Sequence, residues 1–271
     1  MKCNHWSAGV LLAASLTAAH AAEALTYFSE RPENTGATTF NIGDRFNGPG
    51  VVTVGWLGSK KQVVLPAGEW VVLAAADHDG GGIRPAKLAT VLFGKFARTR
   101  LVTMLGATFN RHAASTTRWL DVEACADERP NQLWHVSTSP SSLSGDCVEM
   151  RAEPRAVPSE KTPLGAELHA NLRRMGGTVR GPAIVTRMYF DEKRSGYLRI
   201  VRTDWPETPD VLKPSEARAD YVKGLIDRVE AYRPLASVGF RKNLDVDDLR
   251  PGALAATASP VVAALARFKD D

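Results

Sequence analysis

The chain has 271 residues, of which 44% are hydrophobic and 24% are charged, with 34 Lys and Arg against 30 Asp and Glu. These values are ordinary for a folded protein and exclude a chain that is disordered throughout. The length corresponds to between one and two average domains and is sufficient for a substantial hydrophobic core. After residue 24 the sequence contains no apolar run of the roughly 20 residues that a membrane-spanning helix requires.

Residues 1–24 have the pattern of a secretory signal peptide. Lys2 supplies a positive start, an apolar stretch follows, and Ala19-His20-Ala21 forms a small-x-small cleavage site. The apolar stretch is shorter than the roughly 20 residues needed to cross a membrane, which favours a cleaved leader over an anchor. We therefore expect a periplasmic or secreted protein.

Removal of the leader leaves two cysteines, Cys125 and Cys147, which enclose 21 residues. Two cysteines in an oxidising compartment predict one disulfide. Closing a loop of this size stabilises a protein by about 3 kcal/mol in the chain-entropy model. The alternative is a reactive redox pair, which usually has a closer spacing such as Cys-x-x-Cys.

Residues 25–152 consist of short β-type runs separated by Gly, Pro, Asn and Asp. The clearest runs are 51–56, 62–65, 69–73, 88–93 and 101–105. Several short strands at hairpin spacing, without helical patterns between them, favour antiparallel pairing. We therefore expect an antiparallel β-rich domain, either a sandwich or a partly open barrel.

The composition changes at residues 153–163, where three prolines predict a stiff connector. Beyond it, apolar residues recur at helical spacing from Leu164 to Met175 and again from Glu216 to Tyr232. Two β-type runs within 183–201 predict a hairpin between these helices. The expected fold class is therefore α+β. Residues 164–271 form a helix-hairpin-helix part that either stands alone or packs with the first domain.

The search for catalytic motifs finds no Gly-x-Ser-x-Gly elbow, no phosphate-binding loop and no His-Glu-x-x-His helix. The segment with most potential for chemistry is Asp77-His78-Asp79, which precedes three glycines. Two carboxylates and an imidazole could bind a metal or form an oriented base if His112 or His135 lay nearby. The alternative is a polar loop whose aspartates accept hydrogen bonds from turn amides.

Positive charge is concentrated in residues 161–202, which hold nine Lys and Arg against three Asp and Glu. Strand alternation in the hairpin would place Arg187, Tyr189, Tyr197 and Arg199 on one face. Arginines interleaved with tyrosines suit an anionic partner through charge-assisted hydrogen bonds and stacking. The alternative is that these charges solubilise an exposed face and pair with acids of the following helix.

Together these patterns predict an exported protein that acts as a binding or cell-envelope accessory module, with no cofactor or metal. The expected partner is an anionic envelope component or an acidic protein surface, and nucleic acid is not expected because of the location. The alternative function is a hydrolase or metal-dependent enzyme centred on Asp77-His78-Asp79. Convergence of His78 with His112 or His135 would favour the enzyme.

Overall fold

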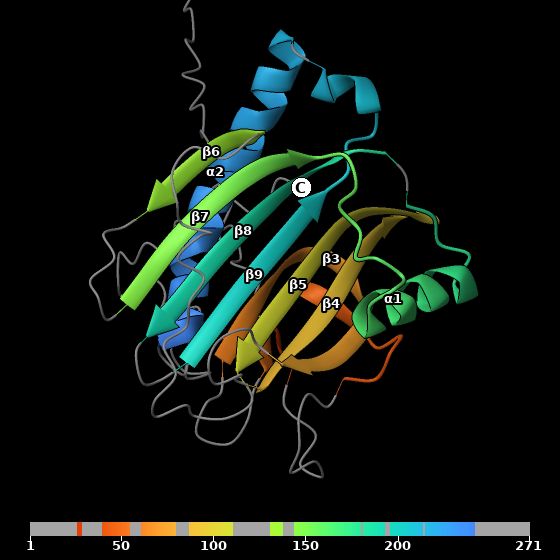
Figure 1. The fold of residues 1–271 in the computed structure, drawn as a ribbon, viewed down its shortest axis with the longest axis vertical. Coiled ribbons are helices and arrows are strands. Elements are labelled where there is room, and N and C mark those ends of the chain that lie inside the picture. The colour runs from red at the N-terminus through yellow and green to blue at the C-terminus, as the bar shows by residue number, and fades with distance from the viewer. Residues whose placement is uncertain are drawn as a thin grey trace, which may run out of the picture.

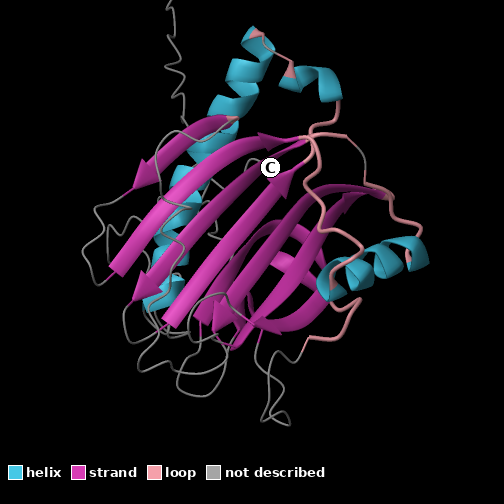
Figure 2. Ribbon diagram, in the orientation of Figure 1, coloured by secondary structure: helices cyan, strands magenta, loops and turns pink. Residues whose placement is uncertain are grey.

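The computed structural model describes residues 26–28, 40–54, 61–79, 87–110, 131–137, 144–179, 181–192, 196–213 and 215–241. The segment 1–24, with its predicted signal peptide, lies outside the described residues. Figure 2 shows a large sheet with helices packed against it. The α+β class with a β-rich part, predicted from the sequence, is confirmed.

The described residues contain nine strands, which form one sheet in the order β1-β2-β3-β4-β5-β9-β8-β7-β6. All neighbours pair antiparallel except β1 and β2, which are parallel. The strands are β1 (Thr26–Phe28), β2 (Arg45–Val54), β3 (Lys61–Asp79), β4 (Lys87–Ala97), β5 (Arg100–Asn110), β6 (Gln132–Ser137), β7 (Ser144–Glu153), β8 (Ala183–Glu192) and β9 (Gly196–Asp204). Because β5 pairs with β9, strands from both sides of the connector 153–163 belong to the same sheet.

Strand β3 is the longest strand and joins two differently paired parts of the sheet. Its first half, from Lys61 to Val71, pairs with β2, and its second half, from Val71 to Asp79, pairs with β4. The register with β4 shifts between Val72 and Ala74. Such a bulge bends a strand and increases its local twist. The sheet therefore changes direction within β3.

The two α-helices lie on opposite faces of the sheet (Figure 1). Helix α2 (Glu216–Arg241) packs on one face and follows the short 3₁₀ helix η2 (Pro209–Leu212). Its residues Leu225, Val229 and Tyr232 belong to the large hydrophobic core with strands from both ends of the sheet. No helix in the described part of the chain is both long enough and apolar enough to cross a membrane.

Helix α1 (Pro163–Arg174) covers the other face, and polar as well as apolar contacts hold it there. Thr162 caps its N-terminus by accepting a hydrogen bond from the Gly165 amide at 3.1 Å. Asn171 Nδ2 donates to the Leu73 carbonyl at 2.8 Å, and the Ala75 amide donates to Glu167 Oε2 at 2.9 Å. These two bonds flank the bulge in β3. They fix α1 against the bent part of that strand.

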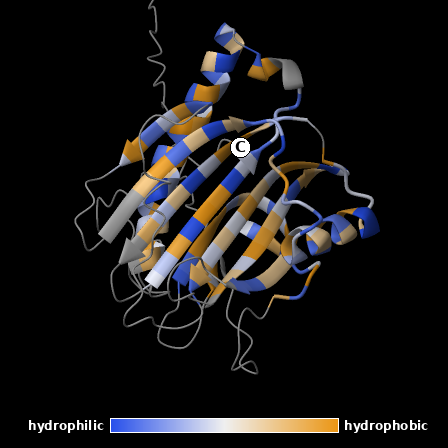
Figure 3. Ribbon diagram, viewed as in Figure 1, coloured by the Kyte–Doolittle hydropathy of each residue, from blue (hydrophilic) through white to orange (hydrophobic). Residues whose placement is uncertain are grey.

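Alternation along β8 and β9 divides their side chains between the two faces. Ile184, Met188 and Ile200 lie in the core beneath α2, as the sequence pattern predicted. The intervening residues, including Arg187 and Arg199, face the side of α1. Figure 3 shows hydrophobic and hydrophilic residues succeeding one another along these strands. The α1 side of the sheet is thus the more polar side at this point.

Candidate functional site

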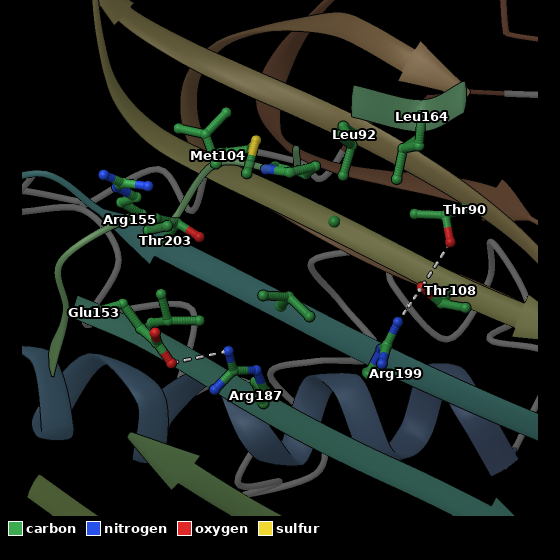
Figure 4. Close-up of a pocket in the computed structure, with 16 residues that line it drawn as sticks. Thr90, Leu92, Met104, Thr108, Glu153, Arg155, Leu164, Arg187, Arg199 and Thr203 are labelled. Carbon is green, nitrogen blue, oxygen red and sulfur yellow. Dashed lines mark hydrogen bonds and ion pairs between the residues drawn. The ribbon is translucent and has the colours of Figure 1, made fainter. Parts of the chain in front are cut away.

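A pocket of about 280 Å³ opens on the α1 side of the sheet (Figure 4). Its floor is formed by β4, β5, β8 and β9, and its wall by the connector after β7 and the start of α1. The lining residues are Thr90, Leu92, Met104, Gly106, Thr108, Glu153, Arg155, Ala156, Val157, Pro158, Leu164, Val185, Arg187, Arg199, Val201 and Thr203. The pocket therefore combines an apolar centre with a small number of charged and hydroxyl groups.

The centre of the floor is open because β5 carries a glycine there. Gly106 pairs with Val201 on β9. A Cβ added to Gly106 would lie 2.9 Å from Leu92 Cδ2, so a larger residue would need Leu92 to move. The glycine keeps a space between Leu92 and Val201 that any other side chain would begin to fill.

Arg187 is neutralised by two carboxylates. Its guanidinium contacts Glu149 Oε1 at 3.2 Å and Glu153 Oε1 at 3.2 Å. The Glu149 side chain is only 1% exposed, whereas those of Arg187 and Glu153 are 23% and 24% exposed. A carboxylate as buried as Glu149 requires an opposite charge beside it. The main role of Arg187 in this arrangement is to hold the two glutamates in the sheet.

Arg199 has a different environment. Its Nη2 donates a long hydrogen bond of 3.4 Å to Thr108 Oγ1, and no carboxylate among the described residues contacts it. Its Nε is buried and has no hydrogen-bond partner within the described part of the chain. A guanidinium has five N–H donors and no acceptor, so most of the donors of Arg199 remain available. The arrangement can accept an anion.

Thr108 connects Arg199 to further polar groups across the sheet. Thr108 Oγ1 lies 2.8 Å from Thr90 Oγ1, which lies 2.9 Å from His78 Nε2. Since Arg199 can only donate, Thr108 accepts from it and keeps its own hydroxyl proton for Thr90 or for a ligand. The row of hydrogen bonds orients the Thr108 hydroxyl at the end of the pocket.

The structure places only two of the four residues predicted to share a face of the hairpin in the pocket. Arg187 and Arg199 both line the pocket, whereas Tyr189 and Tyr197 are 7% and 5% exposed and do not line it. Tyr189 lies opposite Arg199 in the register, against the fully buried Cys147. The tyrosines therefore have little ring surface on which a partner could stack, and the two arginines act without them.

The predicted disulfide joins Cys147, which lies in β7 and is fully buried, to Cys125, which lies outside the described residues. The bridge therefore stays a prediction. His112, one of the residues proposed to complete an enzyme site, also lies outside the described residues.

The segment Asp77-His78-Asp79 forms the end of β3, where Asp77 and His78 are exposed. The other proposed partner, His135, lies on β6, and five strands separate it from β3. His78 and His135 therefore do not converge. No group of three metal-binding side chains occurs among the described residues.

Two pocket residues, Arg155 and Thr108, were not singled out from the sequence. Thr108 lies within a mostly apolar run of β5, and a single threonine in such a run is a weak signal. Arg155 belongs to the proline-rich connector, whose composition indicated only stiffness. A comparison with known protein families, curated proteins and solved structures finds no match for this chain. Function must therefore be inferred from the pocket itself.

Proposed function

We propose that this protein is an exported, non-enzymatic binding module that holds a small anionic molecule in the pocket beside α1. The anionic group would be bound by Arg199 and Thr108. The observation that carries the proposal is the state of Arg199, which lines the pocket without a carboxylate partner among the described residues.

Partly buried arginines are usually paired, because removing a charge from water costs several kcal/mol unless an opposite charge and hydrogen bonds compensate. Arg187 follows this rule, with two glutamates in contact. Arg199 does not, although it lies on the neighbouring strand and on the same side of the sheet. A ligand carboxylate or phosphate would supply the missing charge and accept the unused N–H donors.

The remaining lining favours a small molecule with an apolar body. The non-polar lining residues include Leu92, Met104, Val185, Val201 and Leu164. The volume of about 280 Å³ lies at the lower end of the range for small-molecule sites. At about 30 Å³ for each water, it equals the volume of about nine water molecules. The expected ligand therefore has about ten non-hydrogen atoms.

The exported location and the envelope role are part of this proposal. They are supported by the leader-like pattern of residues 1–24. Because Tyr189 and Tyr197 are buried, they cannot form a face on which a large partner could lie. An anionic envelope component or an acidic protein surface would therefore have to insert a single narrow acidic group into the pocket. A free small acid meets this requirement most simply. The enzyme alternative at Asp77-His78-Asp79 has no second acid–base group converging on His78 among the described residues.

Calorimetric titration tests the proposal with hexanoate, benzoate, adipate and inorganic phosphate. Wild type should bind at least one of these anions, and Arg199→Met should weaken that binding at least about tenfold, because a charge-assisted hydrogen bond contributes about 1.5–3 kcal/mol. Arg174→Met is the matched control, since Arg174 is exposed on α1 and does not line the pocket. Equal binding by wild type and Arg199→Met, or no binding of any of these anions by wild type, would contradict the proposal.

A further inference from the structure

We infer that the ligand carries an anionic group at each end and has a short apolar middle, as a small dicarboxylate does. The inference rests on the proposed function and adds a second recognition point, Arg155, to the one at Arg199. Three arginines line the pocket, namely Arg155, Arg187 and Arg199. They differ in whether a carboxylate of the protein already pairs with them, and this decides which of them can bind a ligand.

The two arginines at the ends of the pocket, unlike Arg187, have no carboxylate partner among the residues that the structure describes. Figure 4 places Arg155 and Arg199 at opposite ends, with Glu153 at the same end as Arg155, and with Arg187 between Glu153 and Arg199. Arg155 is exposed, and neither Glu153 nor any other acid in the described residues forms an ion pair with it. Arg199 donates a hydrogen bond to Thr108 and forms no ion pair with an acid in the described part of the chain. Both guanidinium groups are available to a ligand.

The glutamates near the pocket are matched by other arginines. Glu149 and Glu153 both contact Arg187. Arg151 stands between them on β7, and strand alternation places it on the same face, where it adds a second positive charge. The two negative charges therefore have positive charges of their own, and Arg155 and Arg199 are not needed to neutralise them.

Each end of the pocket also offers a hydroxyl group. Thr108 lies beside Arg199, and Thr203 lies at the Arg155 end (Figure 4). Arg199 and Thr203 are four residues apart on β9, about 13 Å along an extended strand. Val201, between them on the same face, provides apolar floor. One polar pair at each end of an apolar floor matches a molecule with two acidic ends.

The size of the pocket selects among such molecules. Its volume of about 280 Å³ accommodates about ten non-hydrogen atoms by the water-volume comparison. Adipate has ten non-hydrogen atoms, and glutarate is one methylene group shorter. The molecule's central methylene groups would lie over Gly106 and Val201, where the floor has no polar side chain.

The test is calorimetric titration of adipate, glutarate, monomethyl adipate and hexanoate into wild type, Arg155→Gln, Arg199→Gln and the control Arg174→Gln. Monomethyl adipate retains the length of adipate and has one charge fewer. Adipate should bind wild type at least about tenfold more tightly than either monoanion, which corresponds to one additional charge-assisted contact. Arg155→Gln should remove this difference while leaving hexanoate affinity within about twofold, and Arg174→Gln should preserve it.

The possible failures are distinguishable. If hexanoate binds wild type as tightly as adipate and Arg199→Gln weakens both, the dicarboxylate inference is wrong and the proposed anion-binding function stands. If Arg155→Gln leaves the preference for adipate unchanged, the inference is also wrong. If none of the four acids binds wild type, the proposed function fails together with the inference. Arg155 is exposed and forms no ion pair with another described residue, so thermal unfolding of Arg155→Gln should match wild type.

Discussion

Replacing Arg187 and Arg199 by the same residue, methionine, should affect the stability of the protein in different ways. Methionine keeps an unbranched apolar side chain in place of the arginine stem and removes the charge. In Arg187→Met, the buried carboxylate of Glu149 and the carboxylate of Glu153 lose their shared partner. In Arg199→Met, no carboxylate among the described residues loses a partner, and Thr108 loses one long hydrogen bond of 3.4 Å.

The magnitudes follow from these contacts. Removing one partner of a buried ion pair typically costs about 3–5 kcal/mol. Arg187 and Glu153 are 23% and 24% exposed, so water can compensate in part, and we expect about 3 kcal/mol for Arg187→Met. Removing Arg199 eliminates a partly buried charge that has no counterion among the described residues. Arg199→Met should therefore lie within about 1 kcal/mol of wild type or be more stable, as is common for residues retained for binding.

Urea unfolding followed by circular dichroism measures the difference in the absence of ligand. With an m-value of about 3 kcal/mol/M, Arg187→Met should lower the unfolding midpoint by about 1 M, and Arg199→Met should leave it nearly unchanged or raise it. Equal destabilisation by the two substitutions would refute the reasoning. It would mean that Arg199 contributes to stability as Arg187 does, and that it is not reserved for a ligand.

The remaining predictions concern two glycines and one tyrosine of helix α2. Gly239→Ala should destabilise the protein by about 1–2 kcal/mol, because its Cβ would lie closer than 3.0 Å to the Gln62 carbonyl oxygen, and overpacking outweighs the gain in helix propensity. Gly224 lies in the same helix, and a Cβ added to it would have nothing within 4 Å, so Gly224→Ala should stabilise the protein by about 0.5–1 kcal/mol. Equal urea midpoints for the two variants would contradict the packing described for Gly239. Burial raises the pKa of Tyr232 above its ordinary value of 10.0. As the pH rises above about 10, the unfolded chain loses this proton while the folded protein keeps it, so the free energy of unfolding falls below its value at neutral pH. Tyr232→Phe loses the 2.8 Å hydrogen bond to the Val64 carbonyl and should be about 1–2 kcal/mol less stable than wild type at pH 7. Its free energy of unfolding, measured with urea at rising alkaline pH, should fall less steeply than that of wild type. Parallel curves for the two proteins would exclude this explanation.

Patterns of local sequence predicted much of the backbone. Apolar spacing from Leu164 to Met175 predicted a helix where α1 (Pro163–Arg174) lies, because one buried face dictates that spacing. Alternation in residues 183–201 correctly separated Ile184 and Met188 from Arg187. What local pattern could not give is the pairing of β9 with β5, since that contact depends on residues about 90 positions apart.

The pocket depends on such distant contacts. Arg187 was predicted to share a face of the hairpin with Arg199, but nothing in its own strand indicated that Glu149 and Glu153 on β7 would neutralise it. Similarly, alternation predicted the common side of Tyr189 and Tyr197 and could not predict that both would be buried. Faces follow from local geometry, whereas burial and charge pairing follow from which strands become neighbours.

The attachment of α1 to the bulge in β3 affects how the pocket meets its ligand. Apolar packing alone would let a helix slide along a sheet, because hydrophobic contact has no preferred direction. Asn171 and Glu167 instead bond to individual backbone groups of Leu73 and Ala75, and a shift of one residue would break both bonds. The distance between the wall and the floor is thereby set before any molecule enters. The proposed selection of a ligand by its length would then require no closing movement, and affinity would not be diminished by the entropy of ordering a lid.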